Sequence, residues 1–279
     1  MKVLIFLAAW KRPEITEICF MGLNRLKKTR FAPEAFCVIS EESMIPLCEQ
    51  YGIKWVMHEN FPLGAKKNFG LSEALKLEWD YLIEIGSDDL VKNELLELYE
   101  KYFGKYDCFG TKSTIVINSF DGECIHLKSD TPYGLGRAIS RKAIEKHCVG
   151  VWVEALTSII SLGRSTRKGE KGFFRLDQAK QLEKDGHGKI VSDQTVRLWK
   201  DEINKGLDNN SNFFLISQGV GHKGIKTDKP LTIDIKGPDN IWPFNNKLGG
   251  SYPIEKALEG LSEKECDAIL DLCGLSIAK

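Results

Sequence analysis

Two adjacent carboxylates, Asp88 and Asp89, directly follow a short apolar run at 81–85. The run has the length and composition of a buried strand, and like charges at its end repel one another. Such a pair is tolerated where solvent screens it or where a cation lies on it. Mg²⁺ and Mn²⁺ take oxygen ligands, commonly one or two carboxylates together with substrate phosphates. The pair therefore predicts a divalent-metal site at the end of this strand.

Polar and aromatic side chains also follow the other predicted strands. An aromatic face, an acidic acceptor and several cations are, together with paired carboxylates, the groups needed to hold a nucleotide diphosphate and its metal. Because parallel α/β sheets bind ligands at the carboxyl ends of their strands, we expect these groups to meet at one edge. They are Trp10, Lys11 and Arg12 after 3–9, Glu41 and Glu42 after 35–40, and Lys66, Lys67 and Asn68 in the turn into 64–77.

Alternating strands and helices in the first half position these groups. Short apolar runs, typical of strands covered on both faces, alternate with stretches whose apolar residues recur at helical spacing. This order predicts the α/β class, with a mainly parallel central sheet and helices on both of its faces. The expected strands are 3–9, 35–40, 53–58 and 81–85, and the expected helices begin at Pro13 and cover 43–51, 64–77 and 91–103.

The second half is less regular. Its final helix opens with Ser262 and Glu265, which have the spacing of a capping box, in which each side chain bonds the backbone of the other. The segment 133–142 reads as a loop leading into a helix. The remaining expected elements are a hairpin over 114–127, a helix over 140–147 N-capped by Ser140, a loop and a short helix over 160–190, a helix over 192–206 and a strand over 231–237.

Composition and missing motifs exclude several classes. The 279 residues include 39 Lys+Arg and 39 Asp+Glu, so overall charge does not indicate a nucleic-acid binder or a polybasic membrane anchor. Eight cysteines without a C-x-x-C pair predict reduced core residues and a cytoplasmic location. The first apolar run is shorter than the ~20 residues of a membrane span. The absence of G-x-G-x-x-G after the first strand, and of a P-loop, disfavours dinucleotide dehydrogenases and P-loop NTPases.

Three stretches together resemble the GT-A nucleotide-sugar glycosyltransferases, particularly the inverting family 2 type. They are VISEES at 38–43, PLGAKKNFGLSEAL at 62–75 and LIEIGSDDL at 82–90, in the order and spacing of that family's motifs. Three positions depart from the pattern. Glu41 and Lys67 stand where Asp and Arg are usual, and Gly86 stands where the first Asp of the metal motif is usual. The fold that the resemblance implies is the Rossmann-like GT-A fold.

The resemblance also implies how a donor would be held. Glu41 would accept a hydrogen bond from the nucleobase, expected to be uracil. Trp10 or Arg12 would pack on the base or ribose. Lys67 and Asn68 would face the ribose or the phosphates.

Metal binding and acid–base chemistry follow from the same resemblance. Asp88, helped by Asp89, would hold Mn²⁺ or Mg²⁺, which neutralises charge on the departing diphosphate. His222, in a glycine-flanked loop, would add a metal or diphosphate ligand. An inverting transfer needs a general base for the acceptor hydroxyl. Asp208, after the glycine of NKG, is the first choice for it, and Asp177 is the second.

A division of labour along the chain is implied as well. Residues 1–110 would bind the nucleotide-sugar donor, and 111–279 would bind the acceptor and add a C-terminal helical extension, packed together as one GT-A domain. Arg137 would contact the acceptor. The Lys, Gly and Arg-rich stretch 160–175 would close over bound donor as a lid.

The expected activity is metal-dependent inverting transfer of a sugar, of hexosyltransferase type, from a nucleotide-diphosphate donor such as a UDP-sugar to a hydroxyl. The acceptor is expected to be a glycan or a modified DNA base of a bacteriophage. Two alternatives stay open. A degenerate GT-A domain would bind carbohydrate or protein without transfer, as the missing acid at Gly86 suggests. A sugar-nucleotide pyrophosphorylase is disfavoured because AAWKRPE (8–14) lacks the glycine-rich loop of that class.

Overall fold

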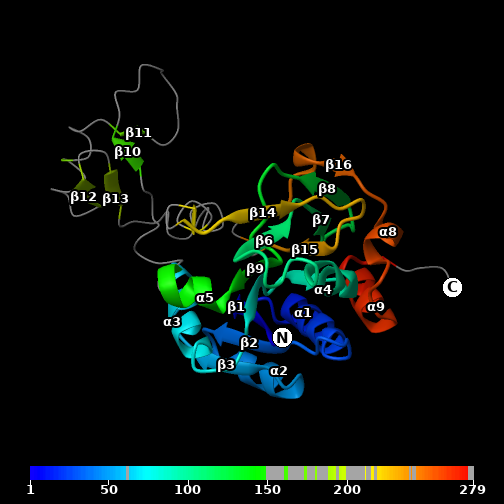
Figure 1. The fold of residues 1–279 in the computed structure, drawn as a ribbon. Helices are drawn as coiled ribbons and strands as arrows, with labels where there is room; N and C mark the ends of the chain where they lie inside the picture. Colours follow the sequence, from blue (N-terminus) through cyan, green and yellow to red (C-terminus); the bar gives the residue numbers. More distant parts are fainter. Residues whose placement is uncertain are drawn as a thin grey trace.

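The computed structural model describes residues 1–60, 63–148, 219–238, 240 and 243–275, together with short pieces between 149 and 218. The pieces are 160–162, 173–174, 180, 188–192, 195–198, 211 and 215–216. The described chain has the α/β fold that the sequence predicts, with a mainly parallel seven-stranded sheet and a second sheet of five strands (Figure 1).

The seven-stranded sheet has the order β14-β6-β9-β4-β1-β2-β3. Strand β1 pairs in parallel with β2 and β4, β2 with β3, and β14 with β6. Strand β9 alone among these runs the other way, antiparallel to both β4 and β6. The strands are β1 Val3–Ala9, β2 Glu34–Ile39, β3 Lys54–Met57, β4 Tyr81–Gly86, β6 Cys108–Thr111, β9 Arg137–Ser140 and β14 His222–Ile225.

Helices cover both faces of this sheet because β1 is apolar on both sides. Ile5 and Leu7 pack in a core with α1, α2 and α4, whereas Leu4 and Phe6 pack in a core with α3 and α5. In Figure 1, α3 and α5 lie to the left of the strands, and α1 and α4 to the right. The helices are α1 Pro13–Leu26, α2 Ile45–Gln50 after a 3₁₀ turn at Glu42–Met44, α3 Leu63–Ala74, α4 Asn93–Tyr99, and α5 Arg141–Ala143, which continues as a π-helical turn over Ile144–Cys148.

The five-stranded sheet packs against the other side of α1. Ile15 and Ile18 of α1 share a core with Ile233 and Ile235 of this sheet and with the C-terminal helix α9. Its strand order is β16-β8-β7-β15-β5. Its strands are β5 Asp89–Val91, β7 Ser113–Asn118, β8 Cys124–Lys128, β15 Thr232–Lys236 and β16 Gly250–Ser251. A 3₁₀ turn at Asn246–Leu248 precedes β16, and helices α8 Ile254–Leu258 and α9 Glu263–Leu272 follow it.

The capping box predicted at the start of α9 is confirmed. Ser262 Oγ accepts from Glu265 N at 3.4 Å, and Glu265 Oε2 accepts from Ser262 N at 2.8 Å. Ser140 likewise caps α5, because its Oγ accepts from Ala143 N at 3.1 Å. The predicted hairpin is also present, as the antiparallel pair β7 and β8.

Several expected elements are wrong. The segment 133–142 contains strand β9 where a loop was expected, and the helix expected over 91–103 begins only at Asn93 because Val91 pairs with Thr232. In the described residues of the helix expected over 192–206, Ser192 ends a strand and Thr195–Leu198 form strand β13, whose β-branched Thr195 and Val196 favour a strand. The strand pairs of this region are β10 Ile160–Leu162 with β11 Phe173–Phe174 and with β13 Thr195–Leu198, and β13 with β12 Gly188–Ser192.

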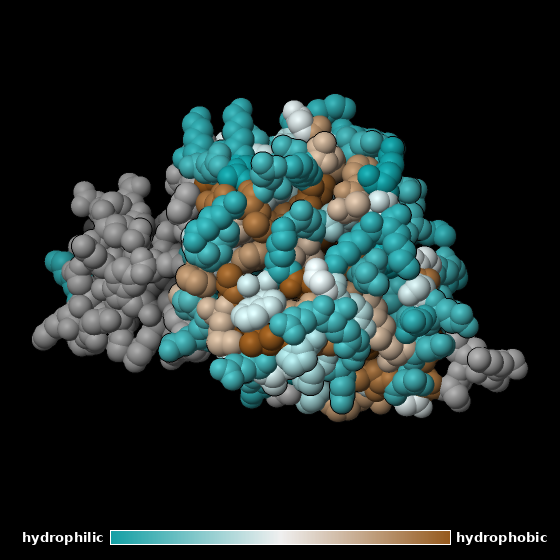
Figure 2. Space-filling view, turned by 90° about the horizontal axis from the view of Figure 1, so that it is seen from below, coloured by the Kyte–Doolittle hydropathy of each residue, from teal (hydrophilic) through white to brown (hydrophobic). Residues whose placement is uncertain are grey.

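The surface and the cysteines fit a folded domain with an apolar interior. On the face shown in Figure 2, hydrophilic residues cover most of the described surface and apolar areas are separated from one another. The seven cysteines whose side chains are described carry free thiols, and six of them are buried. Among the helices of the described ranges, none is long and apolar enough to cross a membrane.

Candidate functional site

The turn between β1 and α1 brings side chains to the carboxyl-end edge of the sheet. The backbone of Lys11 and Arg12 is in the left-handed region there, with φ of 56° and 53°. This conformation is costly for residues that have a Cβ. Contacts from neighbouring strand ends hold the turn. Arg12 Nη1 donates to Asp88 Oδ2 at 2.9 Å and Nη2 to Ser87 Oγ at 3.3 Å, while Lys11 N donates to Glu41 Oε2 at 3.2 Å.

Three carboxylates meet beside this turn. One oxygen from each of Asp88, Asp89 and Asp234 lies within 4.8 Å of the others. Asp89 on β5 lies directly opposite Asp234 on the antiparallel β15, a placement in which like charges repel. Asp89 Oδ2 accepts a hydrogen bond from Gly86 N, which holds this carboxylate against the end of β4.

The chain's own cations lie on these acids. Lys236 Nζ is 2.7 Å from Asp234 Oδ2 and 3.8 Å from Asp88 Oδ2. Asn240 Nδ2 also donates to Asp88 Oδ2, and Asn240 Oδ1 accepts from Gly237 N at 2.6 Å. Arg12 and Lys236 therefore balance part of the negative charge of the three carboxylates.

Burial and these neighbours set the protonation of the acids. Burial alone would raise the pKa of Asp88, but Lys236 and Arg12 hold this pKa below its ordinary value. Burial and the neighbouring Asp88 raise the pKa of Asp89 well above its ordinary value. Burial also raises the pKa of Asp234, to about 6, despite Lys236. The pKa of Asp88 is thus lowered while those of Asp89 and Asp234 are raised, and perturbed pKa values of this kind are common at functional sites.

The donor set fits a divalent metal. It consists of carboxylate oxygens, which Mg²⁺ and Mn²⁺ prefer. Asp234 Oδ1 is buried and has no hydrogen-bond partner, so one oxygen of the group is left over. Asp88, Asp89 and Asp234 are therefore the residues that can hold such an ion.

A second buried ionic cluster lies on the other side of the sheet. Glu84 on β4, 2% exposed, binds Lys67 Nζ at 2.6 Å and Arg137 Nη2 at 2.5 Å. Arg137 Nη2 also donates to Ser211 Oγ at 2.7 Å. Arg137, expected on a surface loop facing the acceptor, is instead a fully buried residue of β9.

Lys66, the neighbour of Lys67 on α3, is also buried. Its Nζ donates to Ala9 O at 2.5 Å and to Asn60 Oδ1 at 3.2 Å. Ala9 is the last residue of β1, so this lysine supports the backbone at the start of the strained turn. Burial lowers its pKa to about 8.

The other residues singled out from the sequence are spread around this edge. Trp10 is half-buried, with Lys11 Nζ 4.4 Å from its ring centre, and Asn68 is half-buried on α3. His222 begins β14, where its Nδ1 lies 3.2 Å from Val220 O and burial lowers its pKa. In the part of the chain that the structure describes, the carboxylate group includes Asp234 and not His222. Asp208 and Asp177 lie outside the described residues.

Four residues of these clusters were missed in the sequence: Glu84, Asp234, Lys236 and Asn240. Three of them carried a readable signal. In LTIDIKG (231–237), Asp234 and Lys236 alternate with apolar residues, so both must point to the same face of β15. Glu84 is a charge inside an apolar run, which requires a buried partner.

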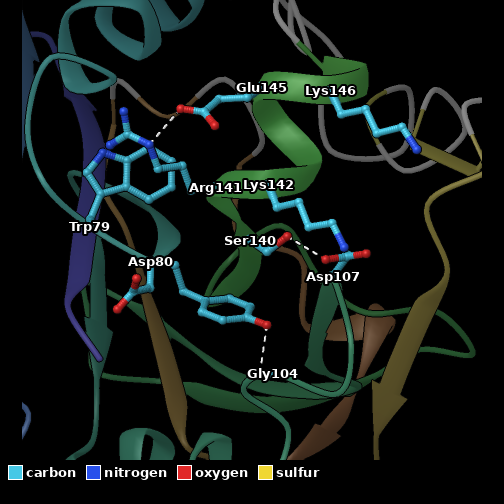
Figure 3. A pocket seen from close by; sticks show the side chains of 10 residues that line it. Trp79, Asp80, Gly104, Asp107, Ser140, Arg141, Lys142, Glu145 and Lys146 are labelled. Atoms are coloured by element: carbon cyan, nitrogen blue, oxygen red, sulfur yellow. Dashed lines mark hydrogen bonds and ion pairs between the residues drawn. The ribbon is translucent and has the colours of Figure 1, made fainter.

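A separate hollow of about 640 Å³ opens at the opposite edge of the sheet, beside the start of β4 (Figure 3). Its polar groups are largely bonded to each other: Arg141 Nε to Glu145 Oε1 at 2.7 Å, and Ser140 Oγ to Asp107 Oδ1 at 2.6 Å. The Arg141 guanidinium also lies 5.2 Å from the Trp79 ring centre. Ligands of parallel sheets bind at the other edge. The hollow is lined by Trp79, Asp80, Tyr81, Gly104, Asp107, Ser140, Arg141, Lys142, Glu145 and Lys146.

No protein-family model and no curated protein matches the chain. Among solved structures it is similar to S. aureus TarS 1-349, over 98% of this chain and 70% of that one, with 11% identity and a TM-score of 0.46. It is also similar to the mannosyltransferase PcManGT from Pyrobaculum calidifontis in complex with GDP-Man and Mn²⁺ (52% and 46%, 11% identity, TM-score 0.37). A third is 4-diphosphocytidyl-2C-methyl-D-erythritolsynthase from Anaerococcus prevotii (81% and 86%, 12% identity, TM-score 0.39). At these low sequence identities and TM-scores, the similarity concerns the fold alone, and nothing about activity follows from it.

Proposed function

We propose that the chain is a GT-A-type glycosyltransferase that moves a sugar from a nucleotide-diphosphate donor to a hydroxyl acceptor. The observation that carries this proposal is the meeting of Asp88, Asp89 and Asp234 at the carboxyl-end edge, beside the turn that holds Arg12. Carboxylates with cations beside them at this edge suit a metal and a diphosphate. The three ordered sequence stretches at 38–43, 62–75 and 82–90 support the nucleotide-sugar class.

Each part of the edge has a task in this reaction. Asp88, Asp89 and Asp234 would hold Mn²⁺ or Mg²⁺, which when bound neutralises charge on the departing diphosphate. Glu41, whose Oε2 is held by Lys11 N, would accept from a uracil base with its other oxygen. Positioning of donor and acceptor then supplies much of the rate acceleration.

The remaining donor contacts and the general base belong to the same proposal. Lys67 and Asn68 of α3 would face the ribose or phosphates, and Lys67 would have to release Glu84 Oε1, 2.6 Å from its Nζ, to reach them. Asp208, or else Asp177, would take the proton from the acceptor hydroxyl. A glycan or a modified bacteriophage DNA base is the acceptor class that we infer, because each presents a hydroxyl.

Donor binding and donor hydrolysis test this function directly. We expect UDP to bind in calorimetry when Mn²⁺ is present, and UDP-glucose, UDP-N-acetylglucosamine or GDP-mannose to be hydrolysed slowly. Asp88→Asn should lower hydrolysis by about 10²-fold, since the metal contributes several kcal/mol to the transition state. Asp130→Asn, at an exposed loop position, is the matched control and should match the wild type. Failure of all nucleotides and nucleotide sugars to bind would refute the proposal.

A second candidate is a domain that binds a nucleotide sugar without transferring it. It is favoured by Gly86, where an acid is usual in the family, and by the cations already paired with Asp88. Saturable UDP binding with no donor hydrolysis and no transfer to any offered hydroxyl would select it.

A further inference from the structure

We propose that Arg12 is the counter-ion that a divalent metal replaces at Asp88, so that Arg12 sets the metal affinity of the site. The inference rests on the proposed function in one respect, the presence of a metal among these carboxylates. It assigns to Arg12 a role different from packing on the base or ribose. It also answers how two adjacent acids are tolerated at the end of β4 when no metal is bound: the chain supplies its own cation.

The Oδ2 atom of Asp88 is crowded with donors. Arg12 Nη1 lies 2.9 Å away, Asn240 Nδ2 donates to the same atom, and Lys236 Nζ lies 3.8 Å away. A carboxylate oxygen offers about two lone-pair directions. Oδ1 is turned toward Gly86, where a Cβ atom would come within 2.5 Å of it. A metal ion can therefore bind Oδ2 of Asp88 only if one of the present donors leaves.

Of these donors, Arg12 has the weakest contacts with groups other than Asp88. Lys236 lies in β15, 2.7 Å from Asp234, and Asn240 is tied back to Gly237 N at 2.6 Å. Arg12 also donates to Ser87 Oγ, but at 3.3 Å, near the long limit for a hydrogen bond. Its side chain is 15% exposed, compared with 9% for Lys236, so it has a shorter path to solvent.

The strained backbone of Arg12 also supports its displacement by a metal. Arg12 and Lys11 are consecutive left-handed residues, and such strain persists only where surrounding contacts enforce it. The Arg12–Asp88 pair is one of those contacts. Exchange of Arg12 for a divalent ion keeps positive charge on Asp88 while freeing the turn to relax.

Mn²⁺ alone, with the full chain and without nucleotide, provides the test. Free Mn²⁺ measured by electron paramagnetic resonance gives the affinity of each variant. We expect Arg12→Gln to bind Mn²⁺ about tenfold more tightly than the wild type, because the competing charge is gone, and Arg12→Lys to stay near the wild type. Arg30→Gln, which removes an arginine from the exposed pair with Glu100, is the matched control and should change nothing. Equal or weaker binding by Arg12→Gln overturns the proposal.

Two further measurements localise the effect and guard against misfolding. The gain in affinity must disappear in Arg12→Gln/Asp88→Asn, and a gain that persists overturns the proposal. In the wild type, Mn²⁺ should increase the labelling of Arg12 by phenylglyoxal, read by peptide mass spectrometry, and unchanged labelling contradicts the exchange. If Mn²⁺ exchanges with Arg12 but no nucleotide binds, the proposed function fails alone. If UDP binds with Mn²⁺ but Arg12→Gln leaves Mn²⁺ affinity unchanged, this inference fails alone.

Discussion

Gly86 and Asp88 are so close that a Cβ atom on Gly86 would lie 2.5 Å from Asp88 Oδ1, and 2.9 Å from Asp89 Oδ2. The resemblance to GT-A enzymes places an acid at position 86. In this chain the two following carboxylates fold back over the glycine and fill the space that such a side chain would need. The missing acid is thus part of a different local arrangement of the same edge.

Gly86→Ala should destabilise the protein by about 1–3 kcal/mol, as overpacking of a tight site does. The carboxylates cannot move away freely, because Arg12 and Asn240 hold Asp88 and the Gly86 backbone holds Asp89. Urea denaturation measures the change. Gly250→Ala, at an exposed glycine with nothing within 4 Å of its added Cβ, is the control and should cost much less. Equal losses in the two variants would contradict the crowding at Gly86.

The sequence predicts most of the central sheet because the apolar period is strong there. Strands β1, β2, β3 and β4 coincide with short runs of mostly apolar residues, and α1 and α3 follow them with helical spacing. Strand β9 was missed because its charged Arg137 reads as a surface residue until Glu84 is known to lie opposite it in the sheet. β5 has only three residues, too few for a period of two to be recognised.

The site was predictable only in part, for a physical reason. Asp88 and Asp89 are found from the end of β4, because strand ends are local features. Asp234 joins them through the pairing of β15 with β5, about half the chain away, and no local pattern specifies which strands pair. Lys236 follows from the same pairing. The division at 110, the general base Asp208 and the roles of Trp10 and Asn68 stay predictions.

Lys66 should make the free energy of unfolding vary with pH in the alkaline range. Burial lowers its pKa to about 8 from 10.5, so between these values the unfolded chain binds a proton that the folded chain does not. The free energy of unfolding should therefore rise with pH over this window, by up to about 3 kcal/mol from this group. Urea titrations from pH 7 to 10.5 measure it. In Lys66→Met this part of the rise should vanish, whereas Lys76→Met, at an exposed lysine, should keep it. An unchanged profile in Lys66→Met would rule out the lysine as its source.

Ser262→Ala should lower the free energy of unfolding by about 1 kcal/mol, the usual cost of losing an N-cap. The hydroxyl accepts from Glu265 N, and α9 packs its Ile269 and Leu270 into the core of the five-stranded sheet. Thermal unfolding compared with Ser251→Ala, at an exposed serine, measures the effect. No difference between the two variants would mean that the capping box contributes little to holding α9 in place.

Glu84→Gln should destabilise the protein by about 3–5 kcal/mol, because it leaves the buried charges of Lys67 and Arg137 without this carboxylate. Glu34→Gln is the matched control. Its exposed pair with Lys54 is worth at most about 1 kcal/mol.

The pH dependence of the Glu84→Gln loss separates charge from shape. Burial would raise the pKa of Glu84, but Lys67 and Arg137 lower it below the ordinary 4.5. A carboxyl with a depressed pKa stabilises the fold above its unfolded value and loses that contribution as the pH falls through its folded value. The difference between wild type and Glu84→Gln should therefore shrink as the pH is taken below 4.5. A loss that stayed constant down to acid pH would show that packing of the side chain, and not its charge, holds α3 and β9 to β4.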